Sequence, residues 1–150
     1  MIVENANKAD YAEMLAVWEN SVRATHDFIS EADIAFFKPI IIEQAFPHVL
    51  LKLVRDEHGS ILGFLGVHEG KIEMLFILNR ARGQGVGTLL LQYAINSLNA
   101  ETVDVNEQNP KAVGFYQSNG FEVIARSPLD DMGKPFPILH MRRSQPNKPH

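Results

Sequence analysis

Three glycines and an arginine lie close together in the middle of the chain, in the segment Arg82-Gly83-Gln84-Gly85-Val86-Gly87. An apolar stretch that predicts a strand precedes this segment, and a stretch with helical spacing follows it. At such a junction the free amides of the first helical turn and the positive end of the helix dipole favour an anion. Glycine keeps side chains away from those amides, and arginine adds positive charge. The segment therefore predicts a binding site for a phosphate-bearing ligand.

The spacing of this glycine loop differs from two common phosphate-binding patterns. One residue separates each glycine from the next, so the G-x-G-x-x-G dinucleotide fingerprint is absent, as is the Lys-Ser/Thr pair of a nucleotide P-loop. Short glycine motifs also occur without any ligand. From spacing alone, a plain strand-to-helix turn remains the alternative.

The elements that would position this loop follow from the periodicity of apolar residues. Helices are expected over residues 8–24, from Ser30 to just before Pro47, after the glycine loop to residue 98, and over 110–118. Pro39 should kink or divide the second of these. Capping pairs are expected at the starts of the first two helices, Asn7 with Asp10 and Ser30 with Asp33. Strands are expected over residues 2–4, 49–55, 60–67, 72–77, 102–106, 120–124 and 136–141.

Composition narrows the class of protein. The chain has 150 residues, no cysteine and a formal net charge of −4. It fits one compact domain, and it cannot form a disulfide, a thiolate zinc site or a cysteine nucleophile. The charge disfavours nucleic acid as a partner but suits a cationic substrate. No signal peptide or membrane span is evident, so we expect a cytoplasmic protein without a membrane partner. Six scattered histidines lack metal-ligand spacing, so no metal is expected, and His140 is interpreted as structural.

Two motifs in register resemble those of one family. Leu75-Phe76-Ile77 followed by Arg82-x-x-Gly85-x-Gly87 is similar to the acyl-CoA signature R/Q-x-x-G-x-G/A of the GNAT superfamily of N-acetyltransferases. Residues 109–121 resemble that family's second motif, N-x-x-A-x-x-F-Y-x-x-x-G-F. Residues 21–28 and 133–135 further resemble small bacterial members assigned as amine or peptidyl-lysine acetyltransferases.

The resemblance implies a fold and an activity. The fold would be a single α/β (α+β) GNAT domain over residues 1–143, followed by a disordered tail over 144–150. A mixed, mostly antiparallel sheet of about six to seven strands would carry about four helices on its two faces. The chain would transfer an acetyl group from acetyl-CoA to a primary amine, either a small molecule or a lysine side chain. It would be a monomer or homodimer.

The resemblance also assigns the acetyl-CoA contacts. The loop would bind the pyrophosphate, and the strand before it would pair with the pantetheine arm as an added strand does. Asn109 would bond the same arm, or cap the helix that begins at Pro110, or both. The implied contacts are Leu75, Phe76, Ile77, Arg82, Gly83, Gln84, Gly85, Val86, Gly87, Thr88, Asn109 and Phe115.

Three side chains are candidates for the chemical step. By resemblance, the Tyr116 hydroxyl would protonate the departing thiolate; its spacing alone also fits a core aromatic. Glu73, a lone carboxylate in an apolar strand, could take the proton of the amine or simply pair with a lysine or arginine. His26 is a second candidate base, although Thr25-His26-Asp27 could merely end a helix.

Two other classes of function remain open from the sequence. The chain could bind an acyl-CoA without catalysis, as a sensor or a decayed enzyme. It could also be an α/β interaction domain without a cofactor. The identity of the acceptor amine and the preferred acyl chain are not encoded in these motifs.

Overall fold

The computed structural model describes residues 1–26 and 29–144, and its contacts group into two compact units, residues 1–100 and 101–150. Each unit is described by itself. Unit 1 contains four antiparallel strands in the spatial order β1 (Val3–Asn5), β2 (Leu50–Arg55), β3 (Ile61–His68) and β4 (Lys71–Ile77). Among the described residues, no helix combines the length and apolar content needed to cross a bilayer.

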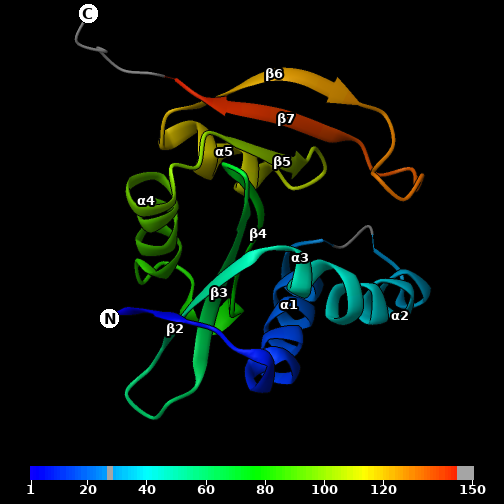
Figure 1. Cartoon of the computed structure of the whole chain (residues 1–150). Helices are drawn as coiled ribbons and strands as arrows, with labels where there is room; N and C mark the ends of the chain where they lie inside the picture. The colour runs from blue at the N-terminus through cyan, green and yellow to red at the C-terminus, as the bar shows by residue number, and fades with distance from the viewer. Residues whose placement is uncertain (27–28, 145–150) are drawn as a thin grey trace, which may run out of the picture. The chain divides into compact units, whose positions relative to one another are not determined.

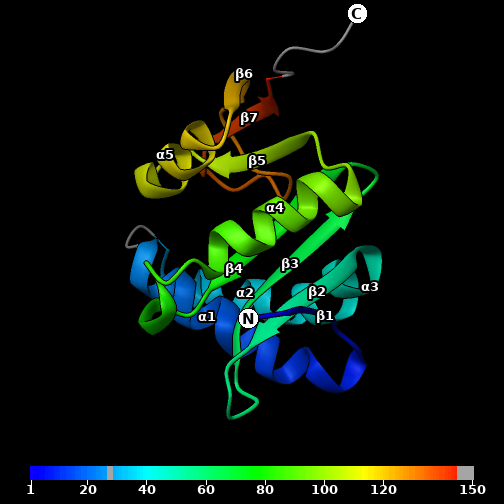
Figure 2. The ribbon, with the colours of Figure 1, turned by 90° about the vertical axis from the view of Figure 1, so that its left-hand side faces the viewer.

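Helices cover both faces of the unit 1 strands (Figures 1 and 2). On one face, α1 (Tyr11–Thr25) and α2 (Glu31–Ile40) enclose a core that includes Met14, Trp18, Phe46, Leu53 and Phe64. The ring of Phe64 lies 5.6 Å from that of Phe46. On the other face, α4 (Val86–Leu98) crosses β2, β3 and β4 and buries Leu90, Leu91 and Ala94.

The expected capping pairs are present at the starts of both N-terminal helices. Asn7 and Asp10 form a reciprocal capping box on a short 3₁₀ turn, Lys8–Asp10, that leads into α1. Ser30 and Asp33 form the same arrangement at α2. These boxes satisfy amides that would otherwise lack acceptors, so the local sequence fixes both helix starts.

The second helical stretch continues beyond the predicted end. We expected it to stop before Pro47, but a π-helical turn at Ile41–Ala45 leads into a short helix, α3 (Phe46–His48). The α pattern ends one residue after Pro39, as expected for a residue without an amide donor. Pro47 lies in the first turn of α3, where a missing donor costs nothing. That is why the helical path does not stop there.

Unit 2 is a three-stranded antiparallel sheet with one helix. Its spatial order is β5 (Thr102–Asn106), β7 (Ile138–Arg143) and β6 (Phe121–Ser127). The helix α5 (Pro110–Ser118) packs on β5 and β6. Beneath it lie side chains that are no more than 4% exposed, namely Val103, Val105, Phe121 and Met141. Ser144, placed in the predicted tail, donates its amide to the Gly120 carbonyl at 2.6 Å. Residues 145–150 lie outside the described residues.

Candidate active site

The glycine loop of unit 1 lies between β4 and α4, as the sequence predicts. After β4 the chain makes a 3₁₀ turn, Asn79–Ala81, and then an exposed turn over residues 82–85. Gly83 and Gly85 have φ angles of +79° and +87°, which side chains rarely adopt. A Cβ at either position would meet no atom within 4 Å, so the backbone conformation, and not space, requires glycine.

The amides at the start of α4 are available to an anion. Gly85 is the N-cap and provides no side-chain hydrogen bond. The Leu89 amide donates to the Gly85 carbonyl at 2.9 Å and makes the first bond of the helix. Val86, Gly87 and Thr88 precede it and therefore have no intrahelical acceptor. With the helix dipole behind them, these amides form a site suited to phosphate.

Close packing joins the end of β4 to this helix start. Gly63 on β3 is paired with Ile77, and a Cβ there would lie 2.6 Å from Ile77 Cδ1 and 3.1 Å from Val86 Cγ1. It would also lie 3.0 Å from the carbonyl oxygen of Phe76. The three implied contacts on β4 are thereby held against β3 in the register Leu65–Leu75, Phe64–Phe76 and Gly63–Ile77. Gly63 was not among the predicted site residues, although a glycine inside an apolar strand signals such a close approach.

Side-chain hydrogen bonds from inside and outside the motif also anchor the loop. The Asn20 side chain, on α1, accepts a hydrogen bond from the Asn79 amide at 2.8 Å. The Gln84 side chain turns back and donates to the Arg80 carbonyl at 3.2 Å. Arg82 is exposed, so its guanidinium is accessible to an anionic ligand. No local pattern singles out Asn20, because its partner is 59 residues away.

Glu73 occupies an irregular position on β4. Gly66 pairs with Met74 and Val67 with Ile72, so Glu73 is the extra residue of a β-bulge. Its side chain lies 4.0 Å from the Lys71 ammonium and is 31% exposed. The pairing with a lysine that we considered is therefore present, and the exposed carboxylate also remains accessible to a proton donor.

His26 ends α1. Its backbone amide donates to the Val22 carbonyl at 2.7 Å, and its Nδ1 lies 2.7 Å from the Thr25 hydroxyl. The helix-ending role considered for this histidine is thus present, and the ring is half-buried. Asp27, its predicted neighbour at the break, lies outside the described residues.

Unit 2 holds the other candidates on α5. Asn109 is the N-cap of this helix, where its side chain accepts from the Ala112 amide at 3.2 Å. Tyr116 is 6% exposed. Its ring lies edge-on between those of Phe115 and Phe121, at 5.3 and 5.6 Å. Burial raises the pKa of the Tyr116 phenol above its ordinary value, so the hydroxyl keeps its proton.

The GNAT resemblance implies two of these features, an anion site at a helix start and a protonated tyrosine on a second helix. The chain belongs to this family. The model described as the acetyltransferase (GNAT) domain matches residues 25–143. The protein is accordingly an N-acetyltransferase, and enzymes of this family use acetyl-CoA.

Individual relatives cover most of the chain. It is 38% identical over 129 residues to the peptidyl-lysine N-acetyltransferase YjaB of Salmonella typhimurium, covering 86% of this chain and 88% of the relative. It is 39% identical over 129 residues to YjaB of Escherichia coli, with 86% and 87% covered. The solution structure of apo-form YjaB from Escherichia coli superposes with a TM-score of 0.84 at 36% identity, covering 95% and 97%. This similarity confirms the predicted α/β GNAT fold.

Proposed function

We propose that the protein transfers the acetyl group of acetyl-CoA to the ε-amine of lysine side chains in peptides or proteins. The observation that carries this proposal is the similarity to two YjaB proteins named as peptidyl-lysine N-acetyltransferases, 38% and 39% identical over 86% of the chain. The net charge of −4 is consistent with an acceptor that carries a positive charge until it reacts.

The donor is held by unit 1 in this proposal. The pyrophosphate binds to the amides of Val86, Gly87 and Thr88, and Arg82 adds charge from the exposed turn. The positive φ angles of Gly83 and Gly85 support this binding mode, because a turn with such angles lets successive backbone amides converge on one anion. The pantetheine arm runs along the Phe76–Ile77 backbone, and Asn109 contributes a polar contact in addition to its cap.

The reaction is a direct attack by the neutral amine on the thioester carbonyl. A bond forms between the lysine nitrogen and the acetyl carbon, and the carbon–sulfur bond breaks. Tyr116 donates its proton to the thiolate of coenzyme A; burial raises the pKa of this phenol, so the hydroxyl keeps its proton until the thiolate leaves. Glu73 or His26 receives the proton that the ammonium loses before it attacks. The nitrogen loses a second proton after it bonds to the acetyl carbon, and that proton replaces the one that Tyr116 gives to the thiolate.

A matched pair of peptides tests the proposal. Both have a blocked N-terminus and the same sequence, except that one contains a single lysine and the other an arginine in its place. Purified protein and acetyl-CoA should release coenzyme A and form one acetyl-lysine, seen by mass spectrometry, with the lysine peptide alone. A thermal shift on adding acetyl-CoA without acetylation across a varied lysine-peptide panel would instead identify an acyl-CoA-binding module.

A further inference from the structure

Three polar side chains of unit 2 form one continuous hydrogen-bonded chain. The Asp104 carboxylate lies 2.7 Å from Nδ1 of His140. Nε2 of the same ring lies 2.6 Å from the Ser127 hydroxyl oxygen. The three residues come from three different strands, β5, β7 and β6. Neither the motifs nor the proposed acetyl transfer uses any of them, and from the sequence we interpreted His140 as structural.

The carboxylate fixes the direction of the first hydrogen bond, and the direction of the second follows for a neutral ring. An ionised carboxylate only accepts, so Nδ1 of His140 carries the proton that is donated to Asp104. In the neutral ring Nε2 then has a lone pair, and it accepts from the Ser127 hydroxyl. A serine bonded to Nε2 of a histidine whose Nδ1 is oriented by a carboxylate is the connectivity of an activated serine nucleophile.

The strand register explains why these side chains meet. Asp104 lies opposite His140 across β5 and β7, while Ser127 lies opposite Ile138, two residues along β7. All three therefore share one face of the unit 2 sheet, whereas Val103 and Met141 point to the face under α5. The side chains of His140 and Asp104 are 32% and 24% exposed, so small molecules can reach these hydrogen-bonded residues.

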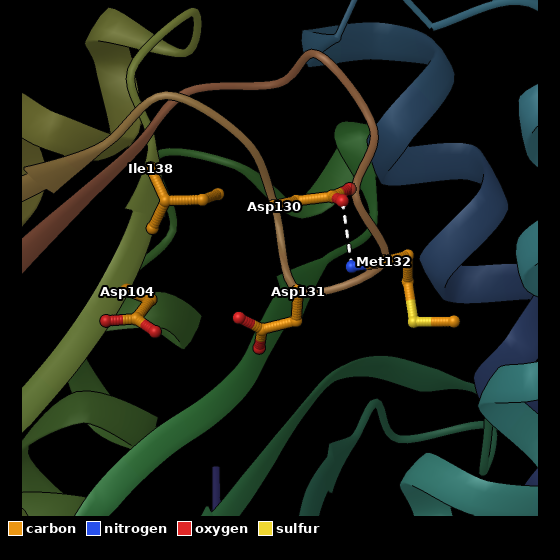
Figure 3. Close-up of a pocket in the computed structure, with 5 residues that line it drawn as sticks. All are labelled: Asp104, Asp130, Asp131, Met132 and Ile138. Carbon is orange, nitrogen blue, oxygen red and sulfur yellow. Dashed lines mark hydrogen bonds between the residues drawn. The ribbon is translucent and has the colours of Figure 1, made fainter.

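Of the three hydrogen-bonded residues, Asp104 lines a pocket of about 180 Å³, while Ser127 and His140 are not among its lining residues (Figure 3). Ile138, the cross-strand partner of Ser127, also lines it. The loop between β6 and β7 supplies Asp130, Asp131 and Met132. Asp130 is held in place by accepting the Met132 amide at 2.9 Å (Figure 3). The mixture of apolar side chains and carboxylates admits an uncharged molecule and repels an anion.

We propose that Ser127 is an activated nucleophile and that the Ser127–His140–Asp104 chain cleaves small uncharged carboxylic esters through an acyl-serine. This activity is separate from acetyl transfer and needs no coenzyme A. It would give the protein a second acyl-transfer centre, with water as the final acceptor.

The chemistry balances with ester and water alone. The Ser127 oxygen bonds to the ester carbonyl carbon while its proton moves to Nε2 of His140. The carbon–oxygen bond to the alcohol then breaks, and the same proton leaves with the alcohol. Water next attacks the acyl-serine, gives a proton to Nε2 and releases the acid, and that proton returns to Ser127. Asp104 orients the ring and stabilises the imidazolium formed in each step.

The first test labels the wild-type chain without coenzyme A. A fluorophosphonate probe should modify one serine, and peptide mass spectrometry should map it to Ser127. With p-nitrophenyl acetate, the first turnover should release a burst of up to one p-nitrophenolate per chain. Because the mapping uses the wild-type chain, it does not depend on whether a variant folds. Absence of label at Ser127 would overturn the proposal.

Variants then separate nucleophile catalysis from reaction at exposed histidines. Ser127→Ala should remove both the label and the burst, and Asp104→Asn should slow acylation by about 100-fold or more. Ser118→Ala, at an exposed serine at the end of α5, is the matched control and should change neither. Circular dichroism confirms that each variant is folded. A folded Ser127→Ala with an undiminished burst would refute the role of this serine.

Discussion

Replacing Gly63 by alanine tests the link between the strand register and the acetyl-CoA site. The new Cβ would lie 2.6 Å from Ile77 Cδ1, 3.0 Å from the Phe76 carbonyl oxygen and 3.1 Å from Val86 Cγ1. Inserting a methyl group into a packed interior costs about 1–3 kcal/mol, and the lower entropy of an unfolded alanine returns roughly 0.4–1 kcal/mol. We expect a net loss of about 1–2 kcal/mol and a fall in Tm of roughly 2–8 °C.

The same substitution should weaken acetyl-CoA binding. The atoms that must move belong to the end of β4 and the first residue of α4, which hold the donor in the proposed function. If binding has to restore the original geometry, a cost of about 1–2 kcal/mol raises Kd roughly five- to thirtyfold. Isothermal titration calorimetry with acetyl-CoA measures this change directly.

Gly66→Ala is the matched control on the same strand. Its Cβ would meet Val49 Cγ2 at 2.8 Å, Met74 Cε at 3.0 Å and Leu51 Cδ2 at 3.4 Å, which are all ends of side chains and no backbone atom. We expect a smaller fall in Tm and an unchanged Kd for acetyl-CoA. If Gly63→Ala bound acetyl-CoA as tightly as Gly66→Ala, the proposed coupling between this packing and the donor site would be wrong.

Three further predictions concern the chemical step and the stability of the fold. Tyr116→Phe should lower turnover about tenfold or more while the Kd for coenzyme A persists, as calorimetry beside a steady-state assay would show; unchanged turnover would remove this hydroxyl from the mechanism. Glu73→Gln should flatten the rise of kcat/KM with pH, and an unaltered profile would point to His26 or to water as the base. The hydrogen bond from the Asn7 amide, and after it the ion pair with Arg55, lowers the pKa of Asp10 in the folded chain. The ionised Asp10 therefore contributes its full stabilisation of the fold above the pKa of the unfolded chain, and this stabilisation is lost as pH falls through the lower pKa of the folded chain. Asp10→Asn should therefore reduce the free energy of unfolding by about 1 kcal/mol at pH 7 and by less near pH 2, measured by urea unfolding.

The sequence predicts most elements because local signals determine them. The limits of β5 and α5 are as predicted, since alternating apolar residues and the Asn109-Pro110 cap mark their ends. The donor loop could be located for the same reason, because glycines in a strand-to-helix turn leave a local pattern. The start of β1 differs by one residue, and β6 extends three residues beyond its predicted end.

The remainder depends on contacts between distant residues. The bulge at Glu73 arises from the pairing of β4 with β3, which periodicity within β4 does not reveal. Asn20 reaches the loop across 59 residues. The chain from Asp104 through His140 to Ser127 requires the register of three strands, and these residues are separated by 36 and 13 positions. Residue types alone did not single them out.

The π-helical turn at Ile41–Ala45 makes this part of the chain sensitive to its length. Ile41 and Phe46 are both buried and stand five residues apart, whereas an α-helix returns to the same face after three or four. Removing one exposed residue, such as Glu43, would restore the α repeat and rotate everything after it by about 100°. Phe46 would then leave its place between the rings of Tyr11 and Phe64. At this surface site a one-residue deletion should therefore harm the protein more than most substitutions, so relatives that preserve this core should also preserve the number of residues between Pro39 and Pro47.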